Sequence, residues 1–203
     1  MSLPLFHVGG ALIWIRTLLA GAACILPASL QNLEETIRKD RPTVISLVPA
    51  QLIRLIENRE MVLILKDMKT LMLGGAPSPG WLIDRSLDLG LPILPTYGCT
   101  ESCAQVTGVA AGSAKAAYHT SGKVIPYRDM RISDDGIILL GGKTLFKRCL
   151  HDADSNPFDA FGFFKTADSG RFDDEGNLII SGRTDGVFIS GGENISPLEI
   201  EQA

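Results

Sequence analysis

Residues 43–60, with the sequence TVISLVPAQLIRLIENRE, join a largely apolar, β-branched run to a segment with helical spacing. The run at 43–48 is continuous rather than alternating, which is typical of a strand buried on both faces of a parallel sheet. Pro49 follows at once, and proline is favoured at the first position of a helix because its fixed φ angle already suits the helix. This stretch therefore predicts a β-strand that leads directly into an α-helix.

The same alternation of strands and helices extends to both sides of this stretch. We expect these further elements, in chain order: a mostly buried helix at 9–21, a strand at 22–27, a helix at 29–40 with Ser29 as a candidate N-cap, a strand at 70–75, a helix at 78–90 and a strand at 91–98. Such an order predicts an α/β fold, a layered and mostly parallel sheet with flanking helices. Ligands of these sheets bind beyond the carboxyl ends of the strands, so the loops at 73–79 and 95–101 are expected to share one crevice.

Hairpin signals replace this alternation in the second half of the chain. Residues 130–142 place two short apolar runs around Asp-Asp-Gly, and residues 171–182 repeat the pattern around Asp-Glu-Gly. The chain then becomes rich in glycine, and a further helix is expected to begin near Ser196. These signals predict a smaller, β-rich part that follows the α/β sheet.

Composition excludes several classes of protein. The chain has 203 residues, of which 45% are hydrophobic and 21% are charged, with a formal net charge of -4. No long run of one charge occurs, so we expect a soluble globular protein without a nucleic-acid surface. The four cysteines form no C-x-x-C pair and the three histidines are scattered, which argues against a structural zinc site and for reduced thiols in the cytoplasm.

The N-terminal apolar stretch has two interpretations. Residues 18–29 have the small-residue composition of a signal peptide, but no positive charge begins the chain and Arg16 interrupts the apolar stretch. The run after Arg16 is also too short to span a bilayer. We therefore expect a buried helix followed by a strand, and no stable membrane anchor.

Several residues have the chemistry of a nucleotide site. Glycine-rich strand ends bring backbone N–H groups close to phosphate oxygens, and the hydroxyl of Thr100 can donate to the same oxygens. Glu101 supplies a carboxylate of the kind that holds Mg²⁺. Tyr97 offers a ring face to a nucleobase, and Asp168 can accept from ribose hydroxyls. Each motif taken singly is more often an ordinary turn with a solvated glutamate.

Seven motifs nevertheless occur in one order: PLFHVGG (4–10), LGGAP (73–77), PTYGCTES (95–102), GGKTLF (141–146), FKTADSG (164–170), DEGNLIISGRTDG (174–186) and SGGENISPLEIE (190–201). This series resembles the adenylate-forming superfamily, which includes acyl-CoA synthetases, adenylation domains of peptide synthetases and luciferases. The resemblance covers essentially the whole chain. Within the superfamily, the motifs at 5–10, 96–102 and 141–146 look most like the 2-succinylbenzoate–CoA ligases of menaquinone synthesis.

The resemblance implies a fold, a reaction and a set of ligands. The expected parts are an α/β subdomain at 1–115, a barrel-like β subdomain at 116–184, and a hinge with the start of a mobile lid domain at 185–203. In the reaction, a substrate carboxylate attacks the α-phosphate of ATP to form an acyl-adenylate, and the thiol of CoA then displaces AMP. The expected ligands are ATP, Mg²⁺, CoA and a small carboxylic acid, first of all 2-succinylbenzoate. A homo-oligomer is compatible with this sequence.

The resemblance also assigns roles to single residues. Thr100, Glu101 and Arg183 would be catalytic, and the other roles follow the family pattern. For the nucleotide, the pattern implies Glu101 for Mg²⁺, Thr100 for the α-phosphate, Tyr97 with the backbone of Gly75 and Ala76 for adenine, Asp168 for ribose, and Arg183 for ribose or phosphate. For the acyl group it implies His7, Gly9 and Gly10, and for the CoA channel Ser190, Gly191 and Gly192. Asp185 would be the hinge.

The chain departs from the family pattern in several places. It contains no Ser/Thr/Gly-rich loop ending in Pro-Lys, and the catalytic lysine of the lid would lie beyond Ala203. We therefore expect the chain to be the central part of a synthetase and to be inactive by itself. Arg148 and Cys149 stand where the family usually has Gly-Tyr, and Ala167 stands where glycine is common.

Other interpretations stay open at this point. The parent activity could be that of another acyl- or aryl-CoA synthetase, or the chain could be a non-catalytic nucleotide-binding module. His7 could be a core histidine, Arg183 a partner in a surface ion pair, and Asp185 an ordinary turn residue. Cys99 and Cys103 flank the Thr-Glu turn without an evident partner base, so we interpret both as packing residues.

Overall fold

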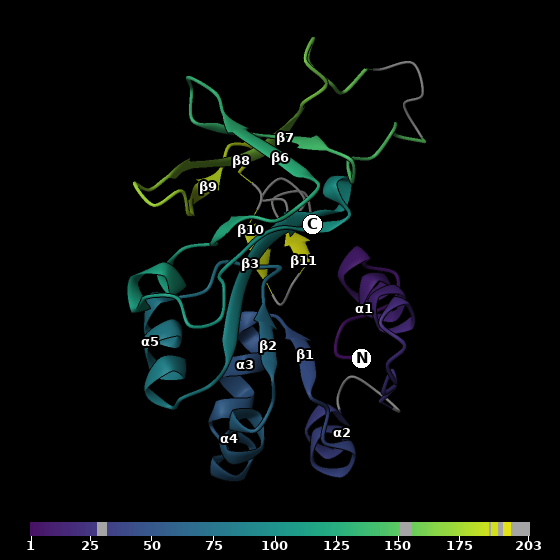
Figure 1. Cartoon of the computed structure of the whole chain (residues 1–203), viewed down its shortest axis with the longest axis vertical. Coiled ribbons are helices and arrows are strands. Elements are labelled where there is room, and N and C mark those ends of the chain that lie inside the picture. Colours follow the sequence, from purple (N-terminus) through teal and green to yellow (C-terminus); the bar gives the residue numbers. More distant parts are fainter. Residues whose placement is uncertain (28–31, 151–155, 187, 191–192, 196–203) are drawn as a thin grey trace, which may run out of the picture.

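The computed structural model describes residues 1–27, 32–150, 156–186, 188–190 and 193–195 (Figure 1). The described strands form a five-stranded sheet, a four-stranded sheet and a two-stranded ribbon. In Figure 1 the four-stranded sheet lies at one end of the long axis, and strands β1 to β3 with helices α2 to α5 lie at the other. The predicted fold class, an α/β sheet followed by a smaller β-rich part, is confirmed.

The five-stranded sheet has the order β1-β2-β3-β4-β5. Its first three strands are parallel, whereas β4 and β5 are antiparallel to their neighbours. The parallel part matches the strands predicted from continuous apolar runs, and the sheet becomes mixed after β3. The strands are β1 (Val44–Leu47), β2 (Thr70–Leu73), β3 (Ile93–Cys99), β4 (Ala104–Gly108) and β5 (Lys123–Val124).

Helices join the parallel strands and supply the main core. The described helices are α1 (Val8–Leu19), α2 (Leu33–Asp40), α3 (Pro49–Ile56), α4 (Arg59–Lys66) and α5 (Gly80–Asp88), with short 3₁₀ turns η2 (Thr100–Ser102) and η3 (Lys115–His119). Aliphatic side chains from α2 to α5 pack with those of β1 to β3 in one buried cluster. Leu52, Met61, Leu65 and Leu82 in this cluster are fully buried, and each such side chain stabilises the fold by roughly 1.5–3 kcal/mol.

The four-stranded sheet is antiparallel throughout and has the order β6-β7-β8-β9. Both predicted hairpins are therefore confirmed, with tight turns at Gly136 and Gly176 that have φ angles of +79° and +81°. Its strands are β6 (Arg128–Ile132), β7 (Ile137–Gly142), β8 (Phe164–Phe172) and β9 (Leu178–Arg183), and the separate ribbon consists of β10 (Phe188–Ser190) and β11 (Glu193–Ile195).

A second, smaller core joins the two sheets. Val106 of β4 packs with Ile138, Leu140 and Leu178 of the four-stranded sheet, and Tyr97 and Cys99 lie against this cluster. Backbone hydrogen bonds add to the seam, because Leu178 N–H donates to the Gly122 carbonyl at 2.8 Å. The end of β3 is thus held against β7 and β9.

The N-terminal helix differs from its prediction. The helix forms at the expected place, but Gly10 is its one buried residue, and Trp14, Ile15, Leu18 and Leu19 are exposed. The prediction of a mostly buried helix was wrong for the described structure. Apolar composition shows that a helix face would gain from being covered, but nothing among the described residues covers this one.

Two local predictions also need correction, and a third falls on residues that the structure does not describe. Residues 22–27 form no strand, and the single helix predicted at 49–60 is two helices, α3 and α4. The break has a local cause, since the Asn58 side chain accepts a hydrogen bond from Glu60 N–H at 3.0 Å and so caps a new helix. The candidate cap Ser29 lies outside the described residues.

Within the described part of the chain, none of the helices has both the length and the apolar character needed to cross a membrane.

Candidate functional site

The carboxyl ends of β1, β2 and β3 lie side by side. Gly74 N–H donates to the Leu47 carbonyl at 3.2 Å, and the Thr96 hydroxyl donates to the Leu73 carbonyl at 3.4 Å. A Cβ at Gly74 would lie 2.5 Å from Thr96 Oγ1, so only glycine allows this approach. The two loops that the sequence placed at one edge of the sheet are therefore adjacent. Gly75, with a φ of +78°, is exposed there and Ala76 is partly buried.

The turn after β3 has a backbone that few residue types permit. A Cβ at Gly98 would lie 1.6 Å from the Ala104 carbonyl oxygen, so the chain closes on itself without space for a side chain. Cys103 and Ala104 both have left-handed backbone angles, with φ of +60° and +67°. The buried Ser102 hydroxyl lies within hydrogen-bonding distance of the Cys99 and Ala104 carbonyls, at 3.0 and 3.1 Å.

This turn presents Thr100 and Glu101. Thr100 is exposed and Glu101 is partly buried, and both belong to the 3₁₀ turn η2. The Glu101 carbonyl accepts a hydrogen bond from Phe146 N–H at 2.8 Å, which ties the turn to the segment after β7. The backbone of Glu101 is thus held by the 3₁₀ turn that contains it and by the segment after β7. Phe146 was not among the predicted site residues, although its motif at 141–146 belonged to the family pattern.

A hydrogen-bonded network lies beside the turn. The Tyr97 hydroxyl donates to Asp168 Oδ2 at 2.7 Å, and Arg183 Nη1 donates to Asp168 Oδ1 at 3.1 Å. Arg183 also pairs with Asp185, and its Nε lies 3.0 Å from Asp185 Oδ1. Four of the predicted residues are thereby brought together from β3, β8 and the end of β9. The Asp168 side chain is 13% exposed and that of Arg183 is 26% exposed.

This network reinforces the ordinary protonated states of Tyr97 and Arg183 by raising the pKa of each group. Burial raises the pKa of the Tyr97 hydroxyl, and the neighbouring Asp168 carboxylate raises it further. The tyrosine therefore stays a neutral donor at physiological pH. The hydrogen bond to Asp185 raises the pKa of the Arg183 guanidinium, with the charge of Asp168 acting in the same direction.

The cysteines beside the turn have no sign of catalytic chemistry. Burial raises the pKa of the Cys99 thiol to about 11, so the thiolate is a minor species at neutral pH. Cys103 is exposed at the left-handed position of the turn. The packing role predicted for Cys99 agrees with its place against the second core, but Cys103 is exposed and does not pack there.

The chemistry of Glu101 suits a magnesium ion only if a ligand shares it. Among the described residues, no group of three or more His, Cys, Asp or Glu side chains could hold a metal ion. A single carboxylate is nevertheless a common protein contribution to Mg²⁺ that is bound mainly by phosphate oxygens and water. Glu101 on a fixed turn fits that arrangement.

The residues predicted for the acyl group lie at the start of α1. His7 is the N-cap residue, and its ring centroid lies 4.8 Å from that of Phe6. A Cβ at Gly10 would lie 1.9 Å from the Pro4 carbonyl oxygen, so this glycine permits residues 1–4 to pack on the helix. At Gly9 a Cβ would lie 3.2 Å from the Leu3 side chain. Helix α1 contacts β4, next to the strand that carries Tyr97.

The residues predicted for the hinge and the CoA channel are only partly described. Asp185 is exposed just after β9, and Gly186 follows with a φ of +72°. The backbone of Ser190 belongs to β10. Gly191, Gly192 and the helix expected at 196–203 lie outside the described residues.

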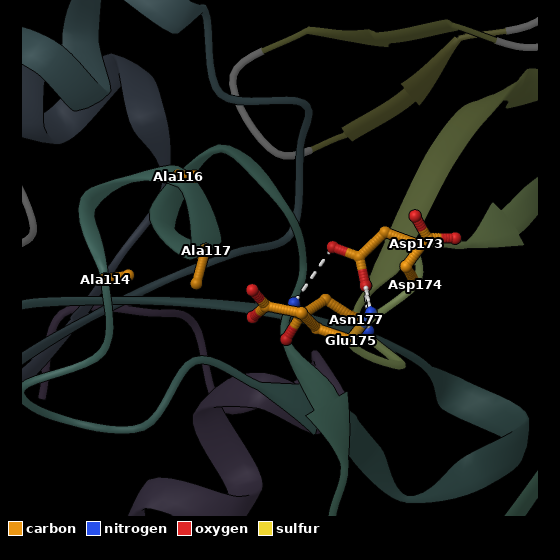
Figure 2. Close-up of a pocket in the computed structure, with 7 residues that line it drawn as sticks. All are labelled: Ala114, Ala116, Ala117, Asp173, Asp174, Glu175 and Asn177. Atoms are coloured by element: carbon orange, nitrogen blue, oxygen red, sulfur yellow. Dashed lines mark hydrogen bonds between the residues drawn. The ribbon is translucent and has the colours of Figure 1, made fainter.

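A separate pocket lies at the β8–β9 hairpin turn (Figure 2). It has a volume of about 220 Å³, and Ala114, Ala116, Ala117, Asp173, Asp174, Glu175 and Asn177 line it. The Asp173 carboxylate accepts hydrogen bonds from Asn177 and from Glu175 N–H, so it is used within the turn itself. Asp168 pairs with Arg183 at the other end of β9, whereas the pocket lies beyond Phe172. None of the predicted site residues lines the pocket.

Comparison with known proteins gives the class of this protein. The model of the AMP-binding enzyme family matches residues 1–146, and the chain belongs to this family. The chain is 31% identical over 214 residues to the 2-succinylbenzoate–CoA ligase of Bacillus pumilus, covering 99% of this chain and 43% of the relative. It therefore spans less than half the length of the curated relatives that it matches.

Solved structures are similar over nearly the whole chain. A double mutant of the o-succinylbenzoate CoA synthetase of Bacillus subtilis, bound with its product analogue OSB-NCoA, has a TM-score of 0.84 at 28% identity, covering 99% of this chain and 43% of that one. The same enzyme in complex with ATP and magnesium ion has a TM-score of 0.77 at 28% identity, with coverages of 100% and 45%. A fatty acyl CoA synthetase of Mycobacterium tuberculosis has a TM-score of 0.77 at 28% identity, with coverages of 98% and 42%.

Proposed function

We propose that this chain belongs to an ATP-dependent acid–CoA ligase, which forms an acyl-adenylate and then a CoA thioester, and that its acid is 2-succinylbenzoate. The observation that carries the proposal is the convergence of Tyr97, Asp168 and Arg183 beside the Thr100–Glu101 turn. This convergence would be of no evident use to a solvated surface turn. The similarity to 2-succinylbenzoate–CoA ligases supports the choice of acid.

Asp168 is the proposed ribose ligand. An ionised carboxylate offers about four acceptor positions. Tyr97 and Arg183 use two of them, one on each oxygen, and the remaining positions suit the two hydroxyls of a ribose. Because Asp168 is largely buried and already oriented, little side-chain entropy would be lost when the nucleotide binds.

Tyr97 is the proposed base-stacking residue. Its hydroxyl is held by Asp168, which limits rotation of the ring. A nucleobase that stacked on the ring would have the backbone of Gly75 and Ala76 along its edge, because the β2 and β3 ends are neighbours. The positive φ of Gly75 would aim backbone groups into that space.

Thr100, Glu101 and Arg183 are the proposed catalytic residues. Attack of a carboxylate on the α-phosphate brings two anions together, so fixed donors and a cation must stabilise the charge. We assign Thr100 as a donor to the α-phosphate and Arg183 as the cation beside ribose or phosphate. Glu101 would hold Mg²⁺, which when bound supplies further neutralisation of the phosphate oxygens.

The remaining assignments rest on the family pattern and on the place of each residue. His7, Gly9 and Gly10 are proposed for the acyl site, and Ser190, Gly191 and Gly192 for the CoA channel. Asp185 is proposed as the hinge between a β subdomain at 116–184 and a lid that begins at 185–203. The α/β subdomain at 1–115 would carry the acyl and AMP loops, and the β subdomain would contribute β5 to its sheet.

Pyrophosphate exchange by the product of the complete reading frame tests this function. We expect exchange that requires ATP, Mg²⁺ and 2-succinylbenzoate, followed by CoA-dependent release of AMP. Exchange with a fatty acid but not with 2-succinylbenzoate would favour the second candidate, another acyl-CoA synthetase. The structural similarity to the mycobacterial fatty acyl CoA synthetase supports this second candidate. AMP binding without exchange for any acid in a panel would leave the non-catalytic nucleotide-binding module.

We further propose that the protein acts in the cytoplasm on small, soluble ligands. Cell fractionation with an antibody against the chain would test the location, and light scattering of the purified protein would test for a homo-oligomer. Recovery in a washed membrane fraction would contradict the location.

A further inference from the structure

Strand β8 bulges where it carries Asp168. Along the β7–β8 pair, Ile137 is opposite Ser169 and Leu139 is opposite Lys165. Between these pairs β7 has one residue, Ile138, whereas β8 has three, residues 166–168. Extra residues of this kind bend a strand and turn a side chain away from its regular direction, and they are common beside active sites.

The hydroxyl of Thr166 bridges this bulge. Thr166 is 6% exposed, and its Oγ1 donates to the Ile138 carbonyl at 2.9 Å. The same oxygen accepts a hydrogen bond from Asp168 N–H at 3.1 Å. The hydroxyl thus replaces the backbone partners that a regular ladder would provide, at the residue that directs the Asp168 carboxylate toward Tyr97 and Arg183.

The neighbouring residue fixes the other side of the bulge. The Ala167 carbonyl accepts from Thr184 N–H at 2.8 Å and from the Thr184 hydroxyl at 3.1 Å. Thr184 is exposed at the end of β9, whereas Thr166 faces the interior. One threonine therefore holds Asp168 and the other holds the end of β9, and the two contacts can be removed separately.

We propose that Thr166 is a positioning residue for nucleotide binding, which acts through Asp168 and does not touch the ligand. This inference rests on the proposed function, because it assigns Thr166 to the same nucleotide site. Without the hydroxyl, the bulge would lose the contacts to the Ile138 carbonyl and to the backbone N–H and carbonyl of Asp168, and the Asp168 carboxylate would no longer be held in one orientation. The geometry asks only for a hydroxyl, so serine should serve as well.

Thr166→Val and Thr166→Ser in the product of the complete reading frame test the proposal. Valine keeps the shape and removes the hydroxyl, and we expect AMP to bind about tenfold more weakly by calorimetry, a loss of the size of one hydrogen bond between Asp168 and the ribose. The KM for ATP should rise by a similar factor while the KM for the acid stays within about twofold. Thr166→Ser should restore AMP binding to within about twofold of the unaltered protein.

Ser86→Ala is the matched control, because Ser86 is also buried and its hydroxyl donates one hydrogen bond, to the Leu82 carbonyl within α5 at 2.7 Å. It should lower the melting temperature without changing AMP binding. Unchanged AMP affinity in Thr166→Val, or equal losses in Thr166→Val and Thr166→Ser, would overturn the proposal. A loss of AMP affinity in Ser86→Ala as large as that in Thr166→Val would do the same.

Two further outcomes separate this inference from its premise. If the unaltered protein binds neither AMP nor ATP, the proposed function itself fails and the positioning role fails with it. If Thr166→Val does not fold, amide hydrogen exchange of the unaltered protein decides. The Asp168 amide should then be strongly protected, and rapid exchange at that amide would overturn the role of Thr166.

Discussion

The two halves of the candidate site are held in different ways. The turn at 98–104 is held by backbone geometry, with a carbonyl in the place of a missing Cβ and a buried serine between two carbonyls. The junction at 182–186 is held by the β8–β9 ladder as far as Arg183, by the hydrogen bonds of Thr184 to the Ala167 carbonyl, and by the ion pairs of Arg183 with Asp168 and Asp185. The first half requires one close backbone approach, whereas beyond Arg183 the second half depends on side-chain contacts, of which the Arg183–Asp185 pair is the more exposed.

The difference indicates which part of the site can change its conformation at a low free-energy cost. The Arg183–Asp185 pair is partly exposed, and exposed ion pairs contribute only about 0–1 kcal/mol each because water and salt compete for the charges, whereas the Arg183–Asp168 pair is largely buried. Water cannot replace the close backbone contact at Gly98, because the Ala104 carbonyl leaves no space there for another group. With Asp185 as the hinge that we propose, the segment after it would move while the turn at 98–104 keeps its shape.

The largest expected effect comes from Gly98→Ala. A Cβ placed 1.6 Å from the Ala104 carbonyl oxygen must displace the backbone, so we expect the free energy of unfolding to fall by about 3 kcal/mol or more. Gly112→Ala is the control, because Gly112 has a φ of +77° but nothing within 4 Å of its Cβ position. It should cost only about 1 kcal/mol in urea unfolding. Equal losses would mean that the turn is not held by close packing.

Glu101→Gln should act on chemistry rather than on stability. The carboxamide keeps the shape of the side chain and loses the charge proposed to hold Mg²⁺. We expect pyrophosphate exchange to fall about 100-fold, with a melting temperature close to that of the unaltered protein. Glu175→Gln, at the exposed β8–β9 turn, should leave exchange unchanged. An unaltered rate and Mg²⁺ dependence for Glu101→Gln would remove the assigned role.

Asp185→Pro tests the junction at 182–186. Proline fixes φ near -65° and biases Thr184 away from the helical region, so the lid should stay near one orientation. We expect thioester formation from preformed acyl-adenylate to fall at least about tenfold while adenylation is largely kept. Asp185→Ala removes the ion pair but leaves φ free, and it should keep both half-reactions. Parallel losses in the two half-reactions would make Asp185 an ordinary turn residue.

Tyr97→Phe should have the smallest effect, and its size should depend on pH. At pH 7 the loss of the hydrogen bond to Asp168 should cost about 1 kcal/mol. The folded protein raises the pKa of Tyr97 above its ordinary value of 10.0, so only the unfolded chain ionises this group just above pH 10. The stabilisation by Tyr97 is therefore complete below pH 10 and is lost above it, by up to about 1.4 kcal/mol per pH unit.

Unfolding of both proteins in urea between pH 7 and 11 measures this difference. The stability advantage of the unaltered protein over Tyr97→Phe should be constant to about pH 9.5 and should then shrink. A constant advantage at all pH values would mean that Tyr97 ionises normally in the folded state.

Local signals in the sequence predicted most of the fold. The apolar runs at 43–48, 70–75 and 91–98 predicted the three parallel strands, and the Asp-x-Gly turns predicted both hairpins. The exposure of Trp14 and Leu18 on α1 could not be predicted, because burial depends on which segments pack against a helix and not on its own residues. The N-cap at Asn58 is a local signal, but the helical spacing of apolar residues across 49–60 predicted one continuous helix instead of two.

The site was less accessible to such reasoning. Tyr97 and Asp168 are separated by 71 positions, and only the order of motifs indicated that they belong together. The role proposed for Thr166 depends on a change in strand register between β7 and β8, which is a property of pairing and leaves no periodic signal. The sequence indicates the glycines as turn formers, but the need for glycine at position 98 comes from the Ala104 carbonyl, which only the folded turn brings beside it.

The turn at 98–104 also contains an exposed thiol that can be labelled, that of Cys103. Cys103 is exposed and lies one residue after Ser102, in the turn that presents Thr100 and Glu101. The backbone around it is held by Gly98 and Ser102, so a thiol-reactive fluorophore on Cys103 would report from a fixed point beside the site. The substitutions Cys24→Ser and Cys149→Ser would favour labelling at this position, because Cys99 is only partly exposed and its raised pKa keeps the thiol protonated at neutral pH. The emission of the label would then follow ligand arrival without requiring turnover.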